Sequence, residues 1–597
     1  MVLKTRRYTL LDGVAIPVRC APISFILQVA LRLLNAFVPA GTALFTASFV
    51  DTAVAIAQGQ GTYMDIIIPS ILLLATMGYE MLYTKLLTFV KLGLQNGIRL
   101  KYRTALLEKR VRLEYACIES SDDWDLIGRV SVPKSYSTVE EALTTYASLA
   151  LVGISMVASI VSVLSIIVSY SWWIAVFITV ALVPLVWLAV RSGEKIYDAT
   201  AGVEDSYRKH RYFNEVLTGR QTAAERAVFG YTDKISDEFK KIYTYSIDAS
   251  YNERKKRFFR MNLGSIVVGI VTLICIALLL VPTLSGVISF GMFAGLVSAM
   301  GSLISLMRWP LMNCVATLTE ASKYMADLTK FMAMPEAAGA TDPANRNIEP
   351  FESLTFKNVT FTYPGMDTPV LKNLSFTINK GGHYSFVGVD GAGKTTITKL
   401  ITGMYRNYEG EILLNGRELS TYTLAELKAY FVCVFQDFAR YQISFRDNVE
   451  LGSGISMDDA AIEDAAKKAG LSGVLTRIGM DAHLGKIEEN GIDISGGEWQ
   501  RVAMARSIAS PSEVKILDEP TAALDPIAES EIYNNFRDIS HGRTTIFISH
   551  RLGSTKLADT IFVLYSGHVA ECGSHDELME QNGLYAEMFD SQRSWYL

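Results

Sequence analysis

Long runs of hydrophobic residues crowd the first half of the chain, between residues 21 and 310, and stop beyond it. An α-helix needs about 20 mainly apolar residues to cross the hydrocarbon core of a bilayer. Several runs reach that length, although the fourth barely does. The pattern therefore predicts six transmembrane helices, at residues 22–50, 64–90, 145–169, 172–190, 262–284 and 287–309.

Lys and Arg are distributed unevenly among the connections between these spans. The short connections at 51–63, 170–171 and 282–287 contain neither, whereas 91–144 and 191–260 are rich in both. Because Lys and Arg concentrate on the cytoplasmic side of membrane proteins, we expect the two long connections and both termini in the cytoplasm. We predict an integral membrane protein of a bacterial inner (cell) membrane.

The two long connections have a regular pattern that favours helices continuing from the spans into the cytoplasm. Within them, residues 119–126 and 214–229 are candidate contact points for a cytoplasmic domain. Ser or Asp would cap a short helix in the first of these. The alternative for both is a solvated loop.

Two ionisable residues fall inside predicted spans, Arg32 in the first and Glu80 toward the inner side of the second. Such residues usually face the interior of a helical bundle or a wet cavity. We hypothesise that they line a polar path as a pair. The alternative is that one or both lie beyond the hydrocarbon.

The character of the chain changes near residue 336. Residues 336–350 are small, polar and proline-containing, which indicates a linker after a transmembrane domain at 1–335. From 351 to 590, strand-like and helix-like runs alternate with glycine turns, as in α/β domains, and 591–597 form a tail. We thus predict an α-helical membrane domain followed by an α/β domain.

Composition excludes some classes of protein. The net charge of −5 over 597 residues is small, so nothing indicates a nucleic-acid partner. The 6 cysteines are scattered without a C-x-x-C pair, which argues against a zinc site or a disulfide framework. No short apolar core with a cleavage site follows the basic N-terminus, so we expect no removable signal peptide.

Residues 388–395 read Gly-Val-Asp-Gly-Ala-Gly-Lys-Thr, the spacing of a phosphate-binding loop between a strand-like and a helix-like run. The glycines let backbone N–H groups point at phosphate oxygens, and the helix N-terminus adds partial positive charge. Lys394 would reach the β- and γ-phosphates of ATP, and the Thr395 hydroxyl would bind Mg²⁺. The predicted nucleotide-binding residues of this loop are Gly388, Asp390, Gly391, Ala392, Gly393, Lys394, Thr395 and Thr396.

A second, mostly apolar strand at 514–519 ends in two carboxylates, Asp518 and Glu519. Ligands of open α/β sheets bind at such strand ends. Asp518 would hold Mg²⁺ directly or through water, and Glu519 would act as the general base toward the attacking water. Tyr363 would stack on adenine, although an aromatic near a strand end is more often a packing residue.

The order of short motifs adds a resemblance. The motifs are Phe-Thr-Tyr at 361–363, the phosphate loop, Val-Phe-Gln-Asp at 434–437, Ile-Ser-Gly-Gly-Glu at 494–498, Ile-Leu-Asp-Glu-Pro at 516–520, Ala-Leu-Asp at 523–525 and Ile-Ser-His at 548–550. This order resembles the P-loop ATPase domain of the ABC transporter superfamily, across nearly all of 351–590. The membrane half looks like the exporter-type fold of that superfamily.

The resemblance supports the role of Tyr363 and implies roles for three more residues. Tyr363 matches the adenine-stacking aromatic. Gln436 matches the glutamine that senses Mg²⁺ and the γ-phosphate and meets the membrane domain. Asp525 matches the loop that links two ATP sites, and His550 matches the switch histidine that contacts the γ-phosphate.

The same resemblance assigns Ser495, Gly496 and Gly497 to the signature loop, which presents N–H groups to a γ-phosphate bound on a partner domain. Two neighbours depart from the usual motif, since Ile494 replaces Leu and Glu498 replaces Gln. Both changes are mild because the Ser-Gly-Gly core contacts phosphate.

The family encloses ATP between the phosphate loop of one domain and the signature loop of another. A chain with one of each therefore implies a half-transporter that forms a homodimer, or a heterodimer with a second half-transporter, in the lipid bilayer. The implied function is ATP-driven export of a lipid-like, peptide or amphipathic small molecule. The alternatives are import through the same fold, for example of a siderophore, and an ATP-gated regulator or channel.

Overall fold

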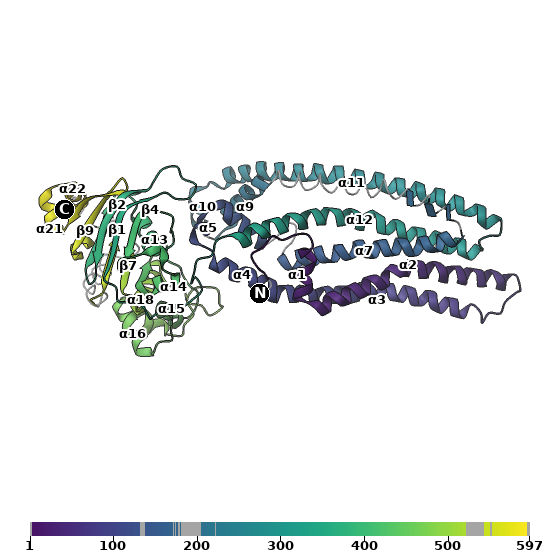
Figure 1. The fold of residues 1–597 in the computed structure, drawn as a ribbon, viewed down its shortest axis with the longest axis horizontal. Helices are drawn as coiled ribbons and strands as arrows, with labels where there is room; N and C mark the ends of the chain where they lie inside the picture. Colours follow the sequence, from purple (N-terminus) through teal and green to yellow (C-terminus); the bar gives the residue numbers. More distant parts are fainter. Residues whose placement is uncertain are drawn as a thin grey trace. The chain divides into compact units, whose positions relative to one another are not determined.

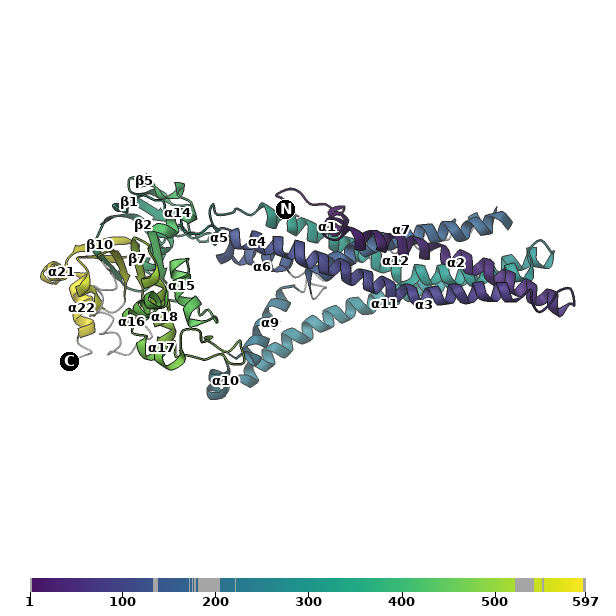
Figure 2. The same ribbon diagram turned by 90° about the horizontal axis from the view of Figure 1, so that it is seen from below.

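The chain divides into two compact units, shown in a computed structural model (Figures 1 and 2). The first contains residues 1–108 and 125–333, and the second contains 109–124 and 334–597. Residues 302–316, 319 and scattered positions between 204 and 275 are described by their backbone only. The structure describes residues 3–131, 138–170, 172–173, 175–176, 179–180, 204–220, 222–520, 542–549 and 552–593.

The first unit is helical throughout its described residues, apart from short connections. The long helices α2, α3, α7, α11 and α12 run beside one another (Figures 1 and 2). The helices are α1 (Asp12–Cys20), α2 (Pro22–Ala57), α3 (Ile67–Ile98), the π-helix η1 (Arg99–Arg103), α4 (Thr104–Arg112), α6 (Ser121–Ser131), α7 (Val139–Tyr170), α9 (Glu204–Thr218), α10 (Ala223–Phe229), α11 (Thr232–Leu284) and α12 (Phe290–Ala333).

Three described helices are long and apolar enough to cross a membrane, namely 22–57, 67–112 and 139–169. They contain the first and third predicted spans whole and the second from residue 67 onward. They are longer than the spans, because hydropathy marks the apolar stretch and not the helix that continues beyond it. The fourth predicted span lies mostly outside the described residues. The fifth and sixth lie largely within α11 and α12.

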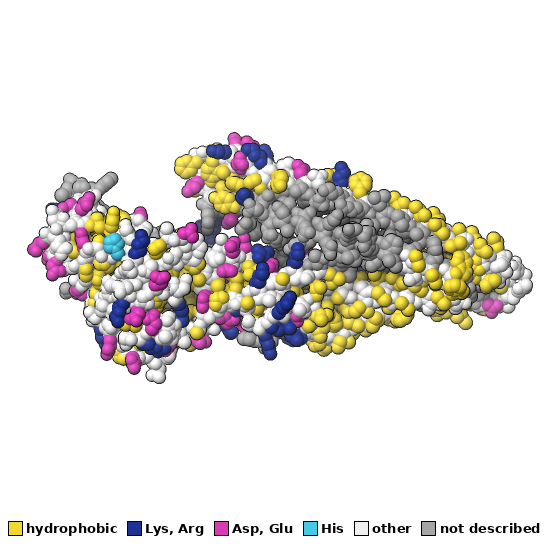
Figure 3. All heavy atoms as spheres, turned by 45° about the horizontal axis from the view of Figure 1, so that its top comes forward, with side chains coloured by type: hydrophobic (Ala, Val, Ile, Leu, Met, Phe, Trp, Pro, Cys, Tyr) yellow, Lys and Arg dark blue, Asp and Glu magenta, His cyan; other side chains and the backbone are white. Residues whose placement is uncertain are grey.

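Figure 3 shows a broad hydrophobic surface over this unit, with Lys and Arg gathered toward one end.

Small residues bring α2 and α12 into close contact. A Cβ atom built on Gly295 would lie 2.1 Å from the carbonyl oxygen of Ala43, and one on Gly291 would lie 2.2 Å from that of Ala47. Two glycines four residues apart thus face two alanines at the same spacing, as in small-residue contacts between membrane helices. Asp51 fixes the register, since it accepts hydrogen bonds from the N–H of Gly291 (2.7 Å) and from a serine hydroxyl at the start of α12.

The second unit contains two sheets within its described residues. One is four-stranded and antiparallel, in the order β2-β1-β4-β5, and the other is six-stranded, in the order β10-β9-β3-β8-β7-β6. The strands are β1 (Ser353–Phe361), β2 (Leu371–Asn379), β3 (His383–Gly388), β4 (Glu409–Leu414), β5 (Arg417–Glu418), β6 (Phe431–Val434), β7 (Val514–Asp518), β8 (Thr544–Ile548), β9 (Thr560–Tyr565) and β10 (His568–Gly573).

The unit also contains short helices, of which α5 comes from the first half of the sequence, while α15, α16 and α17 pack with α18 in a core of their own. The short helices are α5 (Tyr115–Glu119), α13 (Lys394–Ile401), η2 (Leu419–Thr421), α14 (Leu424–Tyr430), α15 (Phe445–Ser453), α16 (Asp459–Lys468), α17 (Ser472–Ile478), α18 (Gly496–Ala509), η3 (Leu552–Leu557), α21 (His575–Gln581) and α22 (Leu584–Arg593).

The centre of the larger sheet is parallel and buried on both faces. Strands β6, β7, β8, β3 and β9 pair in parallel, and every residue of β7 and β8 is buried. Such strands are mostly apolar, so Lys515 in β7 is unusual. Its side chain is almost fully enclosed, and burial lowers its pKa to about 8. The carboxyl ends of β3 and β7, at Gly388 and Asp518, lie at one edge of the sheet.

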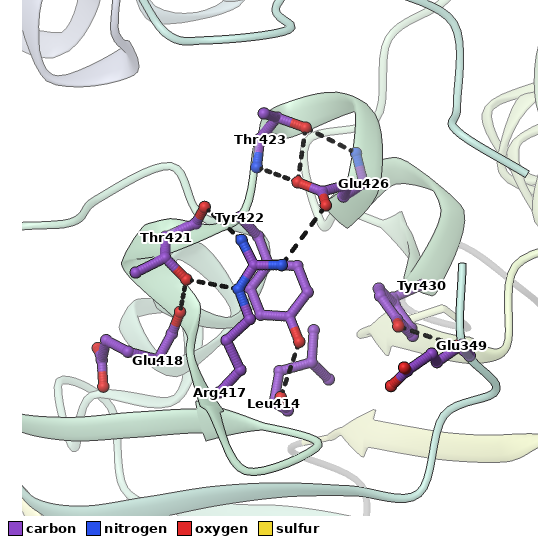
Figure 4. A network of polar contacts seen from close by, with 9 residues as sticks. All are labelled: Glu349, Leu414, Arg417, Glu418, Thr421, Tyr422, Thr423, Glu426 and Tyr430. Carbon is purple, nitrogen blue, oxygen red and sulfur yellow. Dashed lines mark hydrogen bonds and ion pairs between the residues drawn. The ribbon is translucent and has the colours of Figure 1, made fainter. Parts of the chain in front are cut away.

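The predicted linker at 336–350 is attached to α14 rather than loose. Leu424 donates a backbone hydrogen bond to Ala338 (2.8 Å), and Asn345 donates one to Ala425 (2.8 Å). The Tyr430 hydroxyl also donates to the carbonyl of residue 349 (2.9 Å), as Figure 4 shows. These bonds hold the linker along the α/β unit.

A polar network beside this contact joins α14 to the β4–β5 hairpin (Figure 4). Thr423 and Glu426 form a capping box at the start of α14. Arg417 lies 3.7 Å from the Glu426 carboxylate and stacks over the Tyr422 ring, 4.1 Å from its centroid. The network sets the start of α14 and thereby the path of the linker.

Replacing Gly295 by Leu should separate α2 from α12, because the new side chain meets backbone rather than a movable side chain. Overpacking typically costs about 1–3 kcal/mol, so we expect a lower midpoint of thermal unfolding in detergent. The control is Gly78→Leu, where nothing lies within 4 Å of the added Cβ and the midpoint should be unchanged. Equal midpoints for the two variants would contradict the close contact.

Candidate functional site

The phosphate loop has the strand–turn–helix form that its sequence predicts. It starts at Gly388 at the end of β3 and leads into α13 at Lys394. A Cβ atom on Gly388 would lie 2.4 Å from the carbonyl oxygen of Leu564, and Gly393 has a φ of +101°, so both positions favour glycine. The loop is therefore curled tightly at both ends.

The Lys394 side chain lies across the loop that precedes it. Its ammonium group donates hydrogen bonds to the carbonyl oxygens of Gly388 (2.8 Å) and Val389 (3.1 Å). Burial lowers the pKa of Lys394, while the nearby carboxylates, including Asp390 and Glu519, oppose that shift. A buried cation beside backbone N–H groups gives the loop the charge that polyphosphate binding needs.

Asp518 lies at the end of β7 with 1% of its surface exposed. Neither of its carboxylate oxygens has a hydrogen-bond partner in the part of the chain that the structure describes. Burial, assisted by the charge of Glu519, raises the pKa of Asp518 to about 6. Thr395 lies beside it. Two enclosed carboxylate oxygens next to a hydroxyl fit Mg²⁺, which takes few oxygen ligands from the protein.

Glu519 is held by three elements. Its backbone has a φ of +49°, which is uncommon for a residue other than glycine. Its N–H donates to the carbonyl of Ile548 in β8 (2.8 Å), and its own carbonyl accepts from the Gln500 side chain in α18 (3.0 Å). Gln436 donates from Nε2 to the Glu519 carboxylate (3.0 Å). The carboxylate therefore has a fixed position next to Asp518.

Ser495 caps α18, and Glu498 completes the cap. The Ser495 hydroxyl accepts from the N–H of Glu498 (3.2 Å), and the Glu498 carboxylate accepts from the N–H of Ser495 (2.7 Å). The carboxylate also pairs with Arg477 at 2.8 Å. Burial opposes ionisation of Glu498, but the hydrogen bonds from Ser495 and Arg477 outweigh it and lower its pKa. The unusual residue of the motif, Glu498, thus has a structural role in capping α18.

Tyr363 belongs to a group of aromatic rings behind the phosphate loop. Its hydroxyl is 3.0 Å from that of Thr396, and its ring meets Tyr405 edge to face at 5.4 Å. The ammonium of Lys399 in α13 lies 5.2 Å from the centroid of the Tyr363 ring. The ring is partly buried against the hydrophobic core. Its position is therefore set by α13 and by Tyr405.

Helix α5 attaches to the same group. The Glu119 carboxylate pairs with Lys399 (2.7 Å) and accepts a hydrogen bond from the Tyr405 hydroxyl. Burial opposes ionisation of Glu119, but these two hydrogen bonds outweigh it and lower its pKa. Tyr115 packs edge to face on Tyr405, with the ring centroids 5.7 Å apart. Lys399 thus contacts both α5, through Glu119, and the Tyr363 ring.

The backbone on either side of α5 is held as well. Ala337 donates to the carbonyl of Arg112 (2.9 Å), and Glu114 donates to that of Pro335 (3.2 Å). Lys109 is buried and pairs with Glu336 at 2.7 Å.

Of the two predicted contact points, the first, at 119–126, overlaps the attachment of α5. The second, at 214–229, forms the end of α9 and α10 in the first unit.

The structure brings together many of the predicted site residues. The phosphate loop with Lys394 and Thr395, the carboxylates of Asp518 and Glu519, and Gln436 meet at the sheet edge. Ser495, Gly496 and Gly497 start α18, which reaches the same edge through Gln500. Asp525 and His550 lie outside the described residues.

Sequence reasoning missed Lys399, Glu119 and Gln500. Glu119 opens the predicted contact stretch 119–126, but nothing in the sequence indicated its partners, which follow 280 residues later. The hypothesised pair in the membrane half does not form, because Arg32 is buried and Glu80 is exposed, and no ion pair between them occurs among the described residues.

Replacing Glu498 by Ala removes one half of the capping box, so α18 should lose about 1 kcal/mol of stability. We expect a lower midpoint of thermal unfolding together with slower ATP hydrolysis, because the backbone of Gly496 and Gly497 is less well held. The matched control is Glu577→Ala, which removes the capping box of α21 and should lower stability alone. Unchanged hydrolysis in the Glu498 variant would contradict this reasoning.

The Glu119–Lys399 contact can be measured by a double-mutant cycle with Glu119→Gln and Lys399→Met. We expect a coupling energy of up to about 1 kcal/mol in thermal unfolding, because the pair is only partly exposed and also contacts rings. The more exposed pair Lys357–Glu411, at 3.5 Å, serves as the control and should show almost none. A coupling energy no larger than that of the control would argue against the attachment of α5.

Comparisons with known proteins agree with this geometry. Residues 371–522 match the model of the family described as ABC transporter. The subtilin transport ATP-binding protein SpaT of Bacillus subtilis is 28% identical over 516 residues, which cover 84% of this chain and 81% of that protein. The ATP-dependent lipid A-core flippase of Escherichia coli (strain K12) is 29% identical over 443 residues, 73% of this chain and 74% of the flippase.

A solved structure of a bacterial Atm1-family ABC exporter with ATP bound has the same fold. The TM-score is 0.78, with 96% of this chain and 98% of the exporter chain covered, at 23% sequence identity. The match includes the long helices and the α/β unit. Residues 371–522 therefore form a domain of the ABC transporter family, and the chain has the fold of an ABC exporter.

Proposed function

We propose that this chain is one half of an ATP-driven exporter of a lipid-like, peptide or amphipathic small molecule. The observation that carries the proposal is the meeting of Lys394, Asp518, Glu519 and Gln436 at one sheet edge, in a chain that also has helices of membrane-spanning length. The names of the relatives support the cargo classes, since one transports subtilin and another flips lipid A-core.

The ATP site has a role for each of these side chains. Lys394 exchanges its carbonyl partners in the loop for phosphate oxygens of ATP. Thr395 and Asp518, with Gln436 nearby, hold Mg²⁺, which neutralises phosphate charge when it is bound. Glu519, held by Gln436 and by β8, accepts a proton from the attacking water. Tyr363 stacks on adenine.

A complete site needs two chains. The chain carries one phosphate loop and one signature loop, and helix N-termini such as that of α18 bind anions through their N–H groups. We propose that Ser495, Gly496 and Gly497 contact the γ-phosphate bound to a partner. Because Lys394, Asp518 and Glu519 are all present, two copies of the chain would form two competent sites, and a heterodimer with a second half-transporter is the alternative.

ATP drives closure of such a pair only because it binds the closed state more tightly than the open one. That difference in affinity limits how strongly ATP can shift the membrane helices. The attachment of α5 gives one route for this coupling, since Glu119 pairs with Lys399 behind Tyr363. We further propose a bacterial inner membrane with both termini in the cytoplasm, as the Lys and Arg distribution indicates.

Replacing Glu519 by Gln tests the base. The amide keeps the size of the side chain but cannot accept the proton, so hydrolysis should fall by about 100-fold or more. Phosphate release is measured with the purified dimer in nanodiscs, and binding of a fluorescent ATP analogue should persist. Glu580→Gln, at an exposed position of α21, is the control and should leave the rate unchanged. A wild-type rate in Glu519→Gln would refute the assignment.

A further inference from the structure

A polar cluster lies inside the first unit, where α2, α3 and α7 pack together. Gln28 and Arg32 are one turn apart on the buried face of α2, and the rest of that buried face consists of alanines. The opposite face is apolar and exposed, with Ile26 and Phe37 as examples. The polar pair therefore faces the helical bundle, away from the surface that lipid would cover.

Arg32 lies in the first third of α2, a helix long and apolar enough to cross a membrane. It is ten residues from the start of the helix at Pro22, and a rise of 1.5 Å per residue gives about 15 Å. Its neighbours on both sides along the sequence are apolar. A buried charge on such a helix is costly and is kept chiefly where it has a partner or a function.

The protein does not supply a counter-charge to Arg32 among the described residues. Its side chain is 8% exposed, and its Nε atom is buried without a hydrogen-bond partner. Tyr83 of α3 is a near neighbour, and the adjacent Tyr79 hydroxyl is directed at the carbonyl of Leu31 (3.4 Å). Glu80, on the same helix, is exposed and does not reach Arg32. The guanidinium is thus enclosed but not neutralised.

Gln28 is also only half satisfied. It is fully buried, and its Nε2 donates to the Ser148 hydroxyl of α7 at 2.7 Å, while its Oε1 has no partner in the described part of the chain. A serine hydroxyl can donate or accept, so the amide could equally be turned with its NH₂ group outward. In either orientation one polar atom of the amide has no partner among the described residues, one turn of α2 from Arg32.

We infer that Arg32, with Gln28 and Ser148, forms a subsite for an anionic group, phosphate or carboxylate, on the transported compound. A guanidinium binds either group through two parallel hydrogen bonds, and enclosure strengthens them. The inference rests on the proposed export function and adds the charge of its cargo. The apolar surroundings favour an amphiphile, whose tail packs between helices while its head group meets Arg32.

The test uses the purified full-length dimer in nanodiscs of phosphatidylcholine, which carries no net charge. Dodecyl phosphate is titrated in, and its binding is followed by the shift in thermal unfolding. Loss of a charge-assisted hydrogen bond typically costs about 1.5–3 kcal/mol, so Arg32→Gln should weaken binding by about 10- to 100-fold. Arg32→Lys keeps the charge and should retain part of the affinity.

Arg19→Gln is the matched control, because it removes the same charge from an exposed position at the end of α1 and should leave affinity unchanged. Dodecyltrimethylammonium carries the opposite charge and should bind Arg32→Gln no worse than wild type. Methyl phosphate separates the sources: affinity that depends on Arg32 indicates a soluble anion, and dodecyl phosphate binding alone indicates a lipid-like one. Either result supports the subsite.

Equal affinity of wild type, Arg32→Gln and Arg32→Lys for dodecyl phosphate would overturn the inference, as would the absence of binding to wild type. Basal ATP hydrolysis is measured in the same samples and should match wild type in each variant, since Arg32 is not part of the ATP site. The ATP hydrolysis of the proposed function is judged separately, by Glu519→Gln. A negative result for the Arg32 subsite can therefore be distinguished from a negative result for the proposed function.

Discussion

Parallel pairing of β3, β8 and β7 is the constraint on which the ATP site depends. It brings Gly388 and Asp518, 130 residues apart in the sequence, to one edge of a buried sheet. Side chains gathered there cannot spread apart, because the strands below them are enclosed on both faces. The cation of Lys394 and the carboxylates of Asp518 and Glu519 are consequently held close together. Charges fixed at such short range attract oppositely charged groups of a ligand strongly.

Local chemistry explains what the sequence could predict. Glycine spacing, a strand ending in two carboxylates and the apolar runs each specify structure through neighbours in the chain, so the phosphate loop, β7 and the first three spans were predictable. The φ of +49° at Glu519 was not, because it results from the contact with Ile548 in another strand. The partners of Glu119 were hidden for the same reason, since only folding brings Lys399 and Tyr405 to it.

The two polar residues of the membrane half show how far a sequence pattern reaches. Arg32 and Glu80 are both charges within apolar runs of the sequence. In the structure one faces the bundle and the other faces outward, because helical periodicity, and not depth alone, decides what a side chain meets. An intramembrane charge is therefore best interpreted together with the face of the helix that carries it.

Because α5 belongs to the ATP-binding unit, that unit is joined to the helical unit at three points of the chain rather than one. Covalent continuity runs through α4 and α6 on either side of α5, as well as through the end of α12. A body with several tethers transmits rotation as well as translation, whereas a single flexible link would let it swivel. A fragment that begins at residue 334 would also leave Tyr405 and Lys399 uncovered, so it would differ in solubility from the same residues in the whole chain.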